Sequence, residues 1–317
     1  MGVGATLFMD LWNLFLASAR TPKPAVARLK SLGTHTVFGI GLYLCSLLLA
    51  EAAVAAEFTV ERDLAYGSDP KQRLDLFVPA AKGFPTVVFV HGGSLTSGDK
   101  ADEDYRDVCR PFPSAGIACA RVNYRLAPAH AWPAQAEDVA AAVAWVRANI
   151  GARGGDPAKL FLLGHSSGAM LVALIGTEKP AGVRGVIPMG SIMYDDELEQ
   201  AIEKHGKERV EAAFGKDPDN AMYGSLERYL DHWPIRHVAS GMPPYLFLIA
   251  EAEQEHPPVL KTTKAFVERA TALGNRADLR VLPGRNHYGA IRTLAKPGDT
   301  VFAIIRGFVR AGASSTS

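Results

Sequence analysis

One serine in this sequence lies between two glycines in a setting that suits nucleophilic chemistry. Residues 164–168 read G-H-S-S-G and fit the pattern G-x-S-x-G. They follow the buried-strand pattern of residues 159–163 and precede the helix pattern of residues 169–175. A sharp turn from strand to helix exposes the central hydroxyl, and the helix directs its positive N-terminal end at the site. We therefore predict that Ser166 is a nucleophile.

A serine hydroxyl needs a base to remove its proton, and His287 is placed to supply one. Five of the nine histidines follow Ser166 in the chain, but only His287 lies in a loop directly after the last strand pattern. That loop, residues 283–289, reads P-G-R-N-H-Y-G, and its proline and glycines are typical of turns. We predict that His287 accepts the proton of Ser166.

An acid that orients His287 is expected in the loop after the strand pattern of residues 245–250. Residues 251–256 read E-A-E-Q-E-H and contain no aspartate. Glu253 is the first candidate, because it stands three residues beyond the strand. The alternatives, in order, are Glu255, Glu251, and then Asp195 or Asp196 after the preceding strand pattern.

A glycine-containing segment follows the apolar strand pattern of residues 86–90: residues 91–94 read H-G-G-S. It resembles the HGG-type loop of lipases and esterases. Because its residues are small, their backbone N–H groups can approach a substrate carbonyl oxygen closely. We predict that the N–H groups of Gly93, Ser94 and Ser167 form an oxyanion hole.

Strand and helix patterns that must position these residues alternate after residue 57. Eight short apolar or β-rich runs read as strands, at residues 58–64, 73–78, 86–90, 117–123, 160–164, 183–189, 245–250 and 279–282. Further helix patterns lie at residues 134–149, 259–273 and 299–309. This alternation predicts a mostly parallel sheet with helices on both faces. The first two strands have no helix between them, so we expect them to pair as an antiparallel hairpin.

Residues 190–243 separate two of the strand patterns, and this connection is long for a simple crossover. Within it, residues 195–214 are charged and helical in pattern, so we predict a small, cap-like helical insertion over one end of the sheet. The insertion is either a partial lid that shapes a pocket or a solvated helix with no role in function.

The order and spacing of these motifs resemble the α/β-hydrolase superfamily, specifically its carboxylesterase branch of hormone-sensitive-lipase-like and kynurenine-formamidase-like enzymes. Further motifs that carry the resemblance are R-L-D-L at residues 73–76, G-D-K at 98–100, N-Y-R-L-A-P at 123–128, E-D-V at 137–139 and G-G-D-P at 154–157. The resemblance covers about residues 58–310. It implies the α/β-hydrolase fold, a mostly parallel eight-stranded sheet flanked by helices, in a domain of residues 57–317. The sequence departs from the family at Leu95, where tryptophan is usual, and in the acid loop, where aspartate is commoner.

The resemblance also implies a function. A protein of this branch would be a serine carboxylesterase (an EC 3.1.1-type hydrolase) that cleaves small or medium carboxylic esters through an acyl-enzyme, with no cofactor or metal. An amidase or aryl-formamidase with the same triad is one alternative, and a non-catalytic binding protein on the hydrolase fold is another. The expected partner is a small-molecule ester. Nucleic acid is not expected, because 33 acidic residues balance 34 basic ones.

The first 56 residues differ from the rest of the chain. Four basic residues precede an uncharged run at residues 37–50, and small residues follow at residues 50–56. This order is typical of a signal peptide, and the uncharged run is shorter than the roughly 20 residues that span a bilayer. We predict that residues 1–56 are a signal peptide or N-terminal anchor and that the protein is exported, either periplasmic or secreted. Only an uncleaved N-terminal segment would contact the membrane.

Other residues of these motifs are expected to be structural. Arg125 and Asp138 should pair beneath the site, and His165 should be a packed residue rather than a second base. Cys109 and Cys119 flank a turn and could form a disulfide in an oxidising compartment. We nevertheless expect two buried free thiols, because hydrolase cores hold such cysteines without bridging them.

Overall fold

The computed structural model describes residues 58–216, 222–255 and 257–314. The segment expected to be a signal peptide or anchor, residues 1–56, lies outside the described residues. Among the helices that are described, none is long and apolar enough to cross a bilayer.

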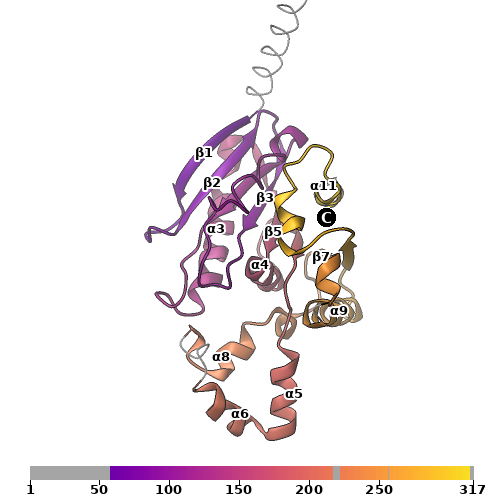
Figure 1. Ribbon diagram of the computed structural model, residues 1–317. Helices are drawn as coiled ribbons and strands as arrows, with labels where there is room; N and C mark the ends of the chain where they lie inside the picture. Colours follow the sequence, from indigo (N-terminus) through magenta and orange to yellow (C-terminus); the bar gives the residue numbers. More distant parts are fainter. Residues whose placement is uncertain (1–57, 217–221, 256, 315–317) are drawn as a thin grey trace, which may run out of the picture. The chain divides into compact units, whose positions relative to one another are not determined.

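Eight strands form one sheet in the order β1-β2-β4-β3-β5-β6-β7-β8 (Figure 1). They are β1 (Phe58–Ala65), β2 (Arg73–Pro79), β3 (Phe84–Val90), β4 (Ala118–Val122), β5 (Gly155–His165), β6 (Val183–Met189), β7 (Tyr245–Ala250) and β8 (Ala277–Leu282). Strand β2 is antiparallel to β1 and to β4, and all other neighbours are parallel. The mostly parallel sheet and the initial hairpin are therefore confirmed.

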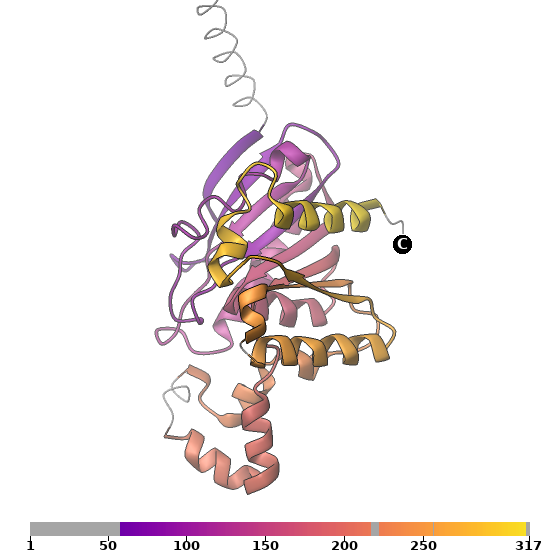
Figure 2. The same ribbon diagram turned by 45° about the vertical axis from the view of Figure 1, so that its right-hand side comes forward.

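Different helices cover the two faces of the sheet. The α-helices outside the insertion are α3 (Ala134–Asn149), α4 (Ser167–Thr177), α9 (Pro257–Ala272), α10 (His287–Arg292) and α11 (Thr300–Ser314). Short 3-10 helices are η1 (Pro113–Ala115), η2 (Gly151–Arg153), η3 (Pro234–His237) and η4 (Glu251–Glu255). Along β3, Val88 and Val90 pack in the core that contains α3, α4 and α9, whereas Val87 and Phe89 pack in the core that contains α11. Figure 2 shows α11, in yellow, crossing in front of the strands. Because both faces are covered, the central strands are apolar at nearly every position.

Three α-helices lie in the part of the insertion between β6 and β7 that the structure describes. They are α5 (Asp196–His205), α6 (Lys207–Phe214) and α8 (Leu226–Asp231). Residues 195–214 are therefore largely helical, as predicted. The helical pattern is divided in two at Gly206, which adopts φ 87° and ψ 148°, outside the helical region. One contact between the insertion and the rest of the domain is at Trp132. The backbone N–H of Trp132 donates to the Met222 carbonyl at 2.9 Å, and the Trp132 ring packs against Tyr223.

The expectation of two free thiols is wrong, since Cys109 and Cys119 form a disulfide. Cys119 lies in β4, and the turn that carries Cys109 packs into the same core beside it. The two Cα atoms are 5.3 Å apart, within the range that a disulfide can bridge.

Candidate active site

Ser166 lies at the sharp turn between β5 and α4, as the sequence predicts. Its backbone has φ 54° and ψ −128°, and its N–H donates to the Met189 carbonyl at 2.9 Å. A non-glycine residue at such a positive φ is strained by roughly 1–3 kcal/mol, and such strain concentrates at functional sites. The turn places the Ser166 side chain at the N-terminus of α4, where the helix dipole favours negative charge.

Three glycines allow the chain to pack closely around this turn. A Cβ on Gly164 would lie 2.1 Å from the Gly168 carbonyl oxygen, and a Cβ on Gly168 would lie 2.3 Å from the Val90 carbonyl oxygen. A Cβ on Gly92 would lie 2.7 Å from the Cβ of Ser166. The loop after β3 can therefore lie directly against the Ser166 side chain only because it has glycine at this position.

His287 is held by Glu253, the first of the candidate acids. Its Nδ1 lies 2.5 Å from Glu253 Oε1, and the Ala250 N–H donates to Glu253 Oε2 at 2.7 Å. A carboxylate can only accept, so the imidazole proton resides on Nδ1 and Nε2 carries a lone pair. Ser166 Oγ and His287 Nε2 are not hydrogen-bonded to each other within the described residues. Such bonds are often long without substrate and tighten in the complex.

The other candidate acids have different partners. Glu251 Oε2 accepts the Gly284 N–H at 2.8 Å, Asp195 caps α5 by accepting the Leu198 N–H, and Asp196 pairs with Lys261. The side chain of Glu255 lies outside the described residues. Of the candidates whose side chains are described, only Glu253 therefore contacts His287.

Gly190, which the sequence analysis did not identify, makes room for Glu253. It directly follows β6, has φ +66°, and a Cβ there would lie 2.5 Å from Glu253 Oε1. The sequence held one indication of this role, a glycine directly after a strand pattern. Site residues gather at the edge of the sheet where the carboxyl ends of parallel strands lie.

His165 connects the Ser166 turn to His287. Its Nε2 lies 2.9 Å from the His287 carbonyl oxygen and its Nδ1 lies 3.1 Å from the Tyr105 hydroxyl. A carbonyl only accepts, so Nε2 donates to His287 and Nδ1 accepts from Tyr105. Burial, with a further contribution from His287, lowers the pKa of His165 to about 4, which keeps the ring neutral near pH 7. His165 is packed, as expected, and the sequence did not reveal its contact with His287.

The predicted oxyanion segment follows Gly92 as a run of left-handed residues. Gly93, Ser94 and Leu95 have φ of 120°, 53° and 64°. The Gly93 carbonyl accepts the Ser97 N–H at 2.9 Å, which closes a turn. Within residues 58–216, 222–255 and 257–314, the N–H groups of Gly93 and Ser94 have no acceptor. They are thus available to a ligand. Leu95, at the usual tryptophan position, is buried.

A second buried polar cluster consists of Asp75, Lys100 and Arg121, here called the Asp75 cluster. Asp75 Oδ1 accepts from Lys100 Nζ at 2.7 Å and from the Asp63 N–H at 2.9 Å. Asp75 Oδ2 accepts from Arg121 Nη2 at 2.7 Å. Burial alone would raise the pKa of Asp75, but these hydrogen bonds outweigh it and hold the pKa below its usual value. The exposed Asp63 carboxylate supplies a second negative charge, 2.8 Å from Lys100 Nζ. The motif residues 73–76 and 98–100 are thus used in a structural ion-pair network.

The expected Arg125–Asp138 pair is also present, with Arg125 Nη2 donating to Asp138 Oδ1 at 2.7 Å. No group of three or more His, Cys, Asp or Glu side chains in the described part of the chain could hold a metal ion.

Comparisons with known proteins bear on this geometry. A BD-FAE family model matches residues 74–260. Esterase LipC of Mycobacterium tuberculosis is 30% identical over 263 residues, which are 77% of this chain and 63% of LipC. The gibberellin receptor GID1 of Oryza sativa subsp. japonica is 35% identical over 145 residues, 44% of this chain and 40% of GID1. The chain therefore spans less than two thirds of the length of these curated relatives.

A solved structure shares the fold. The crystal structure of esterase B from Lactobacillus rhamnosis superimposes with a TM-score of 0.65 at 20% sequence identity. The match covers 87% of this chain and 95% of esterase B.

Proposed function

Since this chain belongs to the BD-FAE family of α/β-hydrolase carboxylesterases, we propose that it is a serine carboxylesterase that hydrolyses small or medium carboxylic esters. The main support is the contact between His287 Nδ1 and Glu253 Oε1 at 2.5 Å, on a histidine that His165 joins to the Ser166 turn. A buried acid, an oriented imidazole and a strained serine are the parts that nucleophilic catalysis requires.

In the proposed reaction, Ser166 Oγ attacks the ester carbonyl carbon while His287 Nε2 takes its proton. Glu253 holds the neutral tautomer and stabilises the imidazolium that forms. The N–H groups of Gly93, Ser94 and Ser167 donate to the tetrahedral oxyanion. His287 then protonates the departing alcohol. Water, deprotonated by His287, releases the acid from the acyl-enzyme and restores the Ser166 hydroxyl.

His165 is proposed as a positioning residue in this reaction. Its neutral ring donates to the His287 carbonyl and accepts from Tyr105, so neither nitrogen is available as a base. The contact ties the His287 backbone to the residue next to the nucleophile. Because the His287 backbone is fixed, His287 Nε2 needs less movement to reach the Ser166 hydroxyl.

A panel of p-nitrophenyl esters and p-nitroanilides of rising acyl length tests the proposal. We expect turnover of short esters, a drop of roughly 10⁴-fold or more in kcat/KM for Ser166→Ala, and no change for Ser114→Ala. Ser114 is an exposed serine whose hydroxyl donates to the Pro111 carbonyl at 3.0 Å. It is not among the residues of the candidate site, so its variant shows the effect of removing a serine hydroxyl elsewhere in the protein. Activity that survives in Ser166→Ala would contradict the mechanism.

The same panel separates the alternatives. Faster cleavage of anilides or of N-formyl arylamines than of esters would indicate an amidase or aryl-formamidase. A folded protein that turns over none of these substrates would indicate a binding protein, a role consistent with the similarity to the receptor GID1. The presence of Ser166, His287 and Glu253 favours the enzyme.

We also propose that the protein is exported. The Cys109–Cys119 disulfide supports this, because such bonds persist in oxidising compartments. N-terminal sequencing of protein recovered from an exporting host should give a start near residue 57, and its intact mass should rise by about 2 Da on reduction. Recovery of a full-length chain with free thiols would contradict export by cleavage.

A further inference from the structure

A groove lies between α11 and the strands β6, β7 and β8, away from Ser166. Its volume is about 770 Å³, within the range of small-molecule sites. It is lined by residues at the amino ends of these strands, such as Val183, Pro244 and Arg276. Ser166 follows the carboxyl end of β5, and these strands are parallel. The groove therefore opens at the opposite edge of the sheet from the candidate active site.

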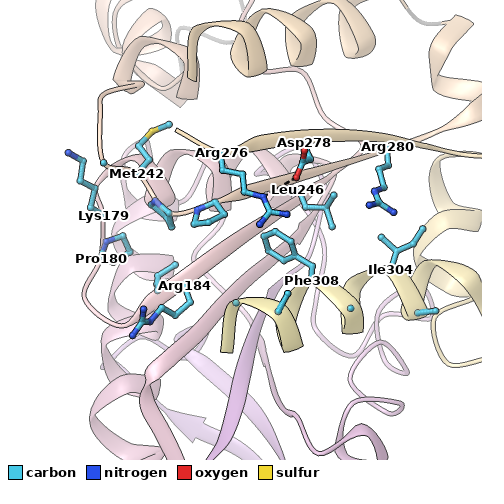
Figure 3. Close-up of a pocket in the computed structure, with 18 residues that line it drawn as sticks. Lys179, Pro180, Arg184, Met242, Leu246, Arg276, Asp278, Arg280, Ile304 and Phe308 are labelled. Atoms are coloured by element: carbon cyan, nitrogen blue, oxygen red, sulfur yellow. Dashed lines mark hydrogen bonds and ion pairs between the residues drawn. The ribbon is translucent and has the colours of Figure 1, made fainter. Parts of the chain in front are cut away.

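Figure 3 shows how the side chains of the groove are arranged. Leu246, Ile304 and Phe308 form an apolar floor. The side chain of Arg276 extends over this floor beside Leu246 and Phe308, and that of Arg280 extends toward Ile304. The groove thus combines an apolar surface with guanidinium groups held directly above it.

The charge of the lining is strongly unbalanced. Four cationic side chains, from Lys179, Arg184, Arg276 and Arg280, line the groove with one carboxylate, Asp278. Asp278 accepts from Arg276 Nε at 3.3 Å, whereas Arg280 has no ion pair or hydrogen bond in the described part of the chain. Cations concentrated around a concavity attract an anion.

Open space beside Gly307 of α11 is a second observation that favours a bound ligand. Gly307 lies inside this helix and lines the groove, yet a Cβ placed on it would meet no atom within 4 Å. Glycine destabilises a helix interior relative to alanine, and no neighbour in the described residues requires it here. The position leaves room for another molecule to approach the helix backbone.

We propose that this groove binds a linear anionic amphiphile, an alkyl carboxylate whose chain lies on Leu246, Ile304 and Phe308 and whose head group lies beside Arg280. The apolar floor provides the burial that holds the chain. The unpaired guanidinium of Arg280 provides the bidentate donors that suit a carboxylate.

Titration calorimetry of the full chain with decanoate, kept below micelle-forming concentrations, tests the proposal. Decyltrimethylammonium, which has the same chain and the opposite charge, is the matched probe. We expect decanoate to bind at least about tenfold more tightly than the cation. Equal binding of the two probes, or no binding of decanoate, would overturn the proposal.

Variants locate the site. Gly307→Leu fills the groove and Arg280→Gln removes the head-group partner, so each should weaken decanoate binding by about tenfold or more. Arg306→Gln, on α11 but outside the groove lining, should leave it unchanged. Gly307→Ala should raise the melting temperature, which controls for changes in the helix. Undiminished decanoate binding in Gly307→Leu would place the ligand elsewhere and overturn the proposal. The proposal would also be overturned if the protein were a dimer that dissociates in Gly307→Leu and does not bind decanoate. The groove would then hold a second copy of the chain.

Discussion

Two polar clusters of this molecule each bury a carboxylate against basic groups. One is the Asp75 cluster, and the other, here called the His287 cluster, consists of Glu253, His287 and His165. They differ in whether every hydrogen-bonding atom has a partner. In the Asp75 cluster, both carboxylate oxygens accept hydrogen bonds, and Lys100 and Arg121 supply the opposite charge. In the His287 cluster, the imidazole next to the carboxylate keeps a lone pair on Nε2, and the neighbouring turn carries a strained Ser166.

The difference shows how two buried polar clusters with similar residue types can have different roles. A network in which every donor and acceptor is used resists change and stabilises the fold. A network that ends on a free basic nitrogen beside a hydroxyl can transfer a proton. Substitutions in the two clusters should therefore affect different measured quantities.

Among substitutions in the two clusters, the largest effect on catalysis should come from Glu253→Gln. Loss of the carboxylate removes the group that fixes the His287 tautomer, so kcat/KM should fall by roughly 10³–10⁴-fold, with a small change in melting temperature. Glu251→Gln is the matched control, because Glu251 is exposed and contacts the Gly284 N–H rather than His287. A large loss in Glu255→Gln with normal activity in Glu253→Gln would instead assign the acid to Glu255.

Asp75→Asn should lower stability and leave catalysis nearly unchanged, the reverse of Glu253→Gln. Lys100 keeps its ion pair with the exposed Asp63 carboxylate at 2.8 Å, but Arg121 is left buried without its counter-charge. The free energy of unfolding should therefore fall by about 3–5 kcal/mol. The kcat of the folded fraction should stay within about twofold of the parent. Chemical denaturation measures the first quantity and active-site titration the second. Asp107→Asn, which removes a half-exposed carboxylate from an ion pair with Arg106, should cost less than about 1 kcal/mol. A loss of kcat in Asp75→Asn with an unchanged free energy of unfolding would contradict a purely structural role for the Asp75 cluster.

His165→Leu should have an intermediate effect, because it removes the donor to the His287 carbonyl and the acceptor of the Tyr105 hydroxyl but none of the reacting groups. We expect kcat to fall roughly 10–100-fold with KM nearly unchanged. His165→Gln, which keeps an N–H donor, should recover part of the loss. Equal defects in the Leu and Gln variants would indicate a packing role without positioning.

The buried histidines should also make stability depend on pH, an effect that is small near neutral pH and grows in acid. Burial lowers the pKa of His165 to about 4 and that of His232 to about 3, against about 6.5 in an unfolded chain. Between about pH 6.5 and about pH 4 the folded state binds fewer protons, so the free energy of unfolding decreases as the pH falls. Each histidine contributes up to about 1.4 kcal/mol per pH unit. His165→Leu should flatten this slope in denaturation curves measured across the range. A slope equal to that of the parent would contradict a neutral, buried His165.

Local patterns predicted the parts of the molecule that depend on local physics. The strands and α3 were found because burial on both faces or on one helical stripe leaves a periodic mark in the sequence. The turn at Ser166 was found because its glycines and flanking patterns are contiguous.

Features that depend on distant segments were missed. The contact between His165 and His287 joins residues 122 positions apart, and the disulfide depends on how a turn packs against β4. The break at Gly206 was missed because glycine inside a charged helical pattern is tolerated as often as it ends a helix. The groove beneath α11 is assembled from three strands and a helix, and no single segment marks it.

Covalent labelling tests most directly the claim that Ser166 is a nucleophile activated by the His287 cluster. The full chain is treated with a fluorophosphonate, and intact mass and peptide mapping locate the adduct. We expect one adduct, on Ser166, with a rate that falls by at least about 10²-fold in His287→Ala and Glu253→Gln but not in Asp75→Asn. An adduct on another residue, or equal labelling rates in all of these variants, would contradict the account.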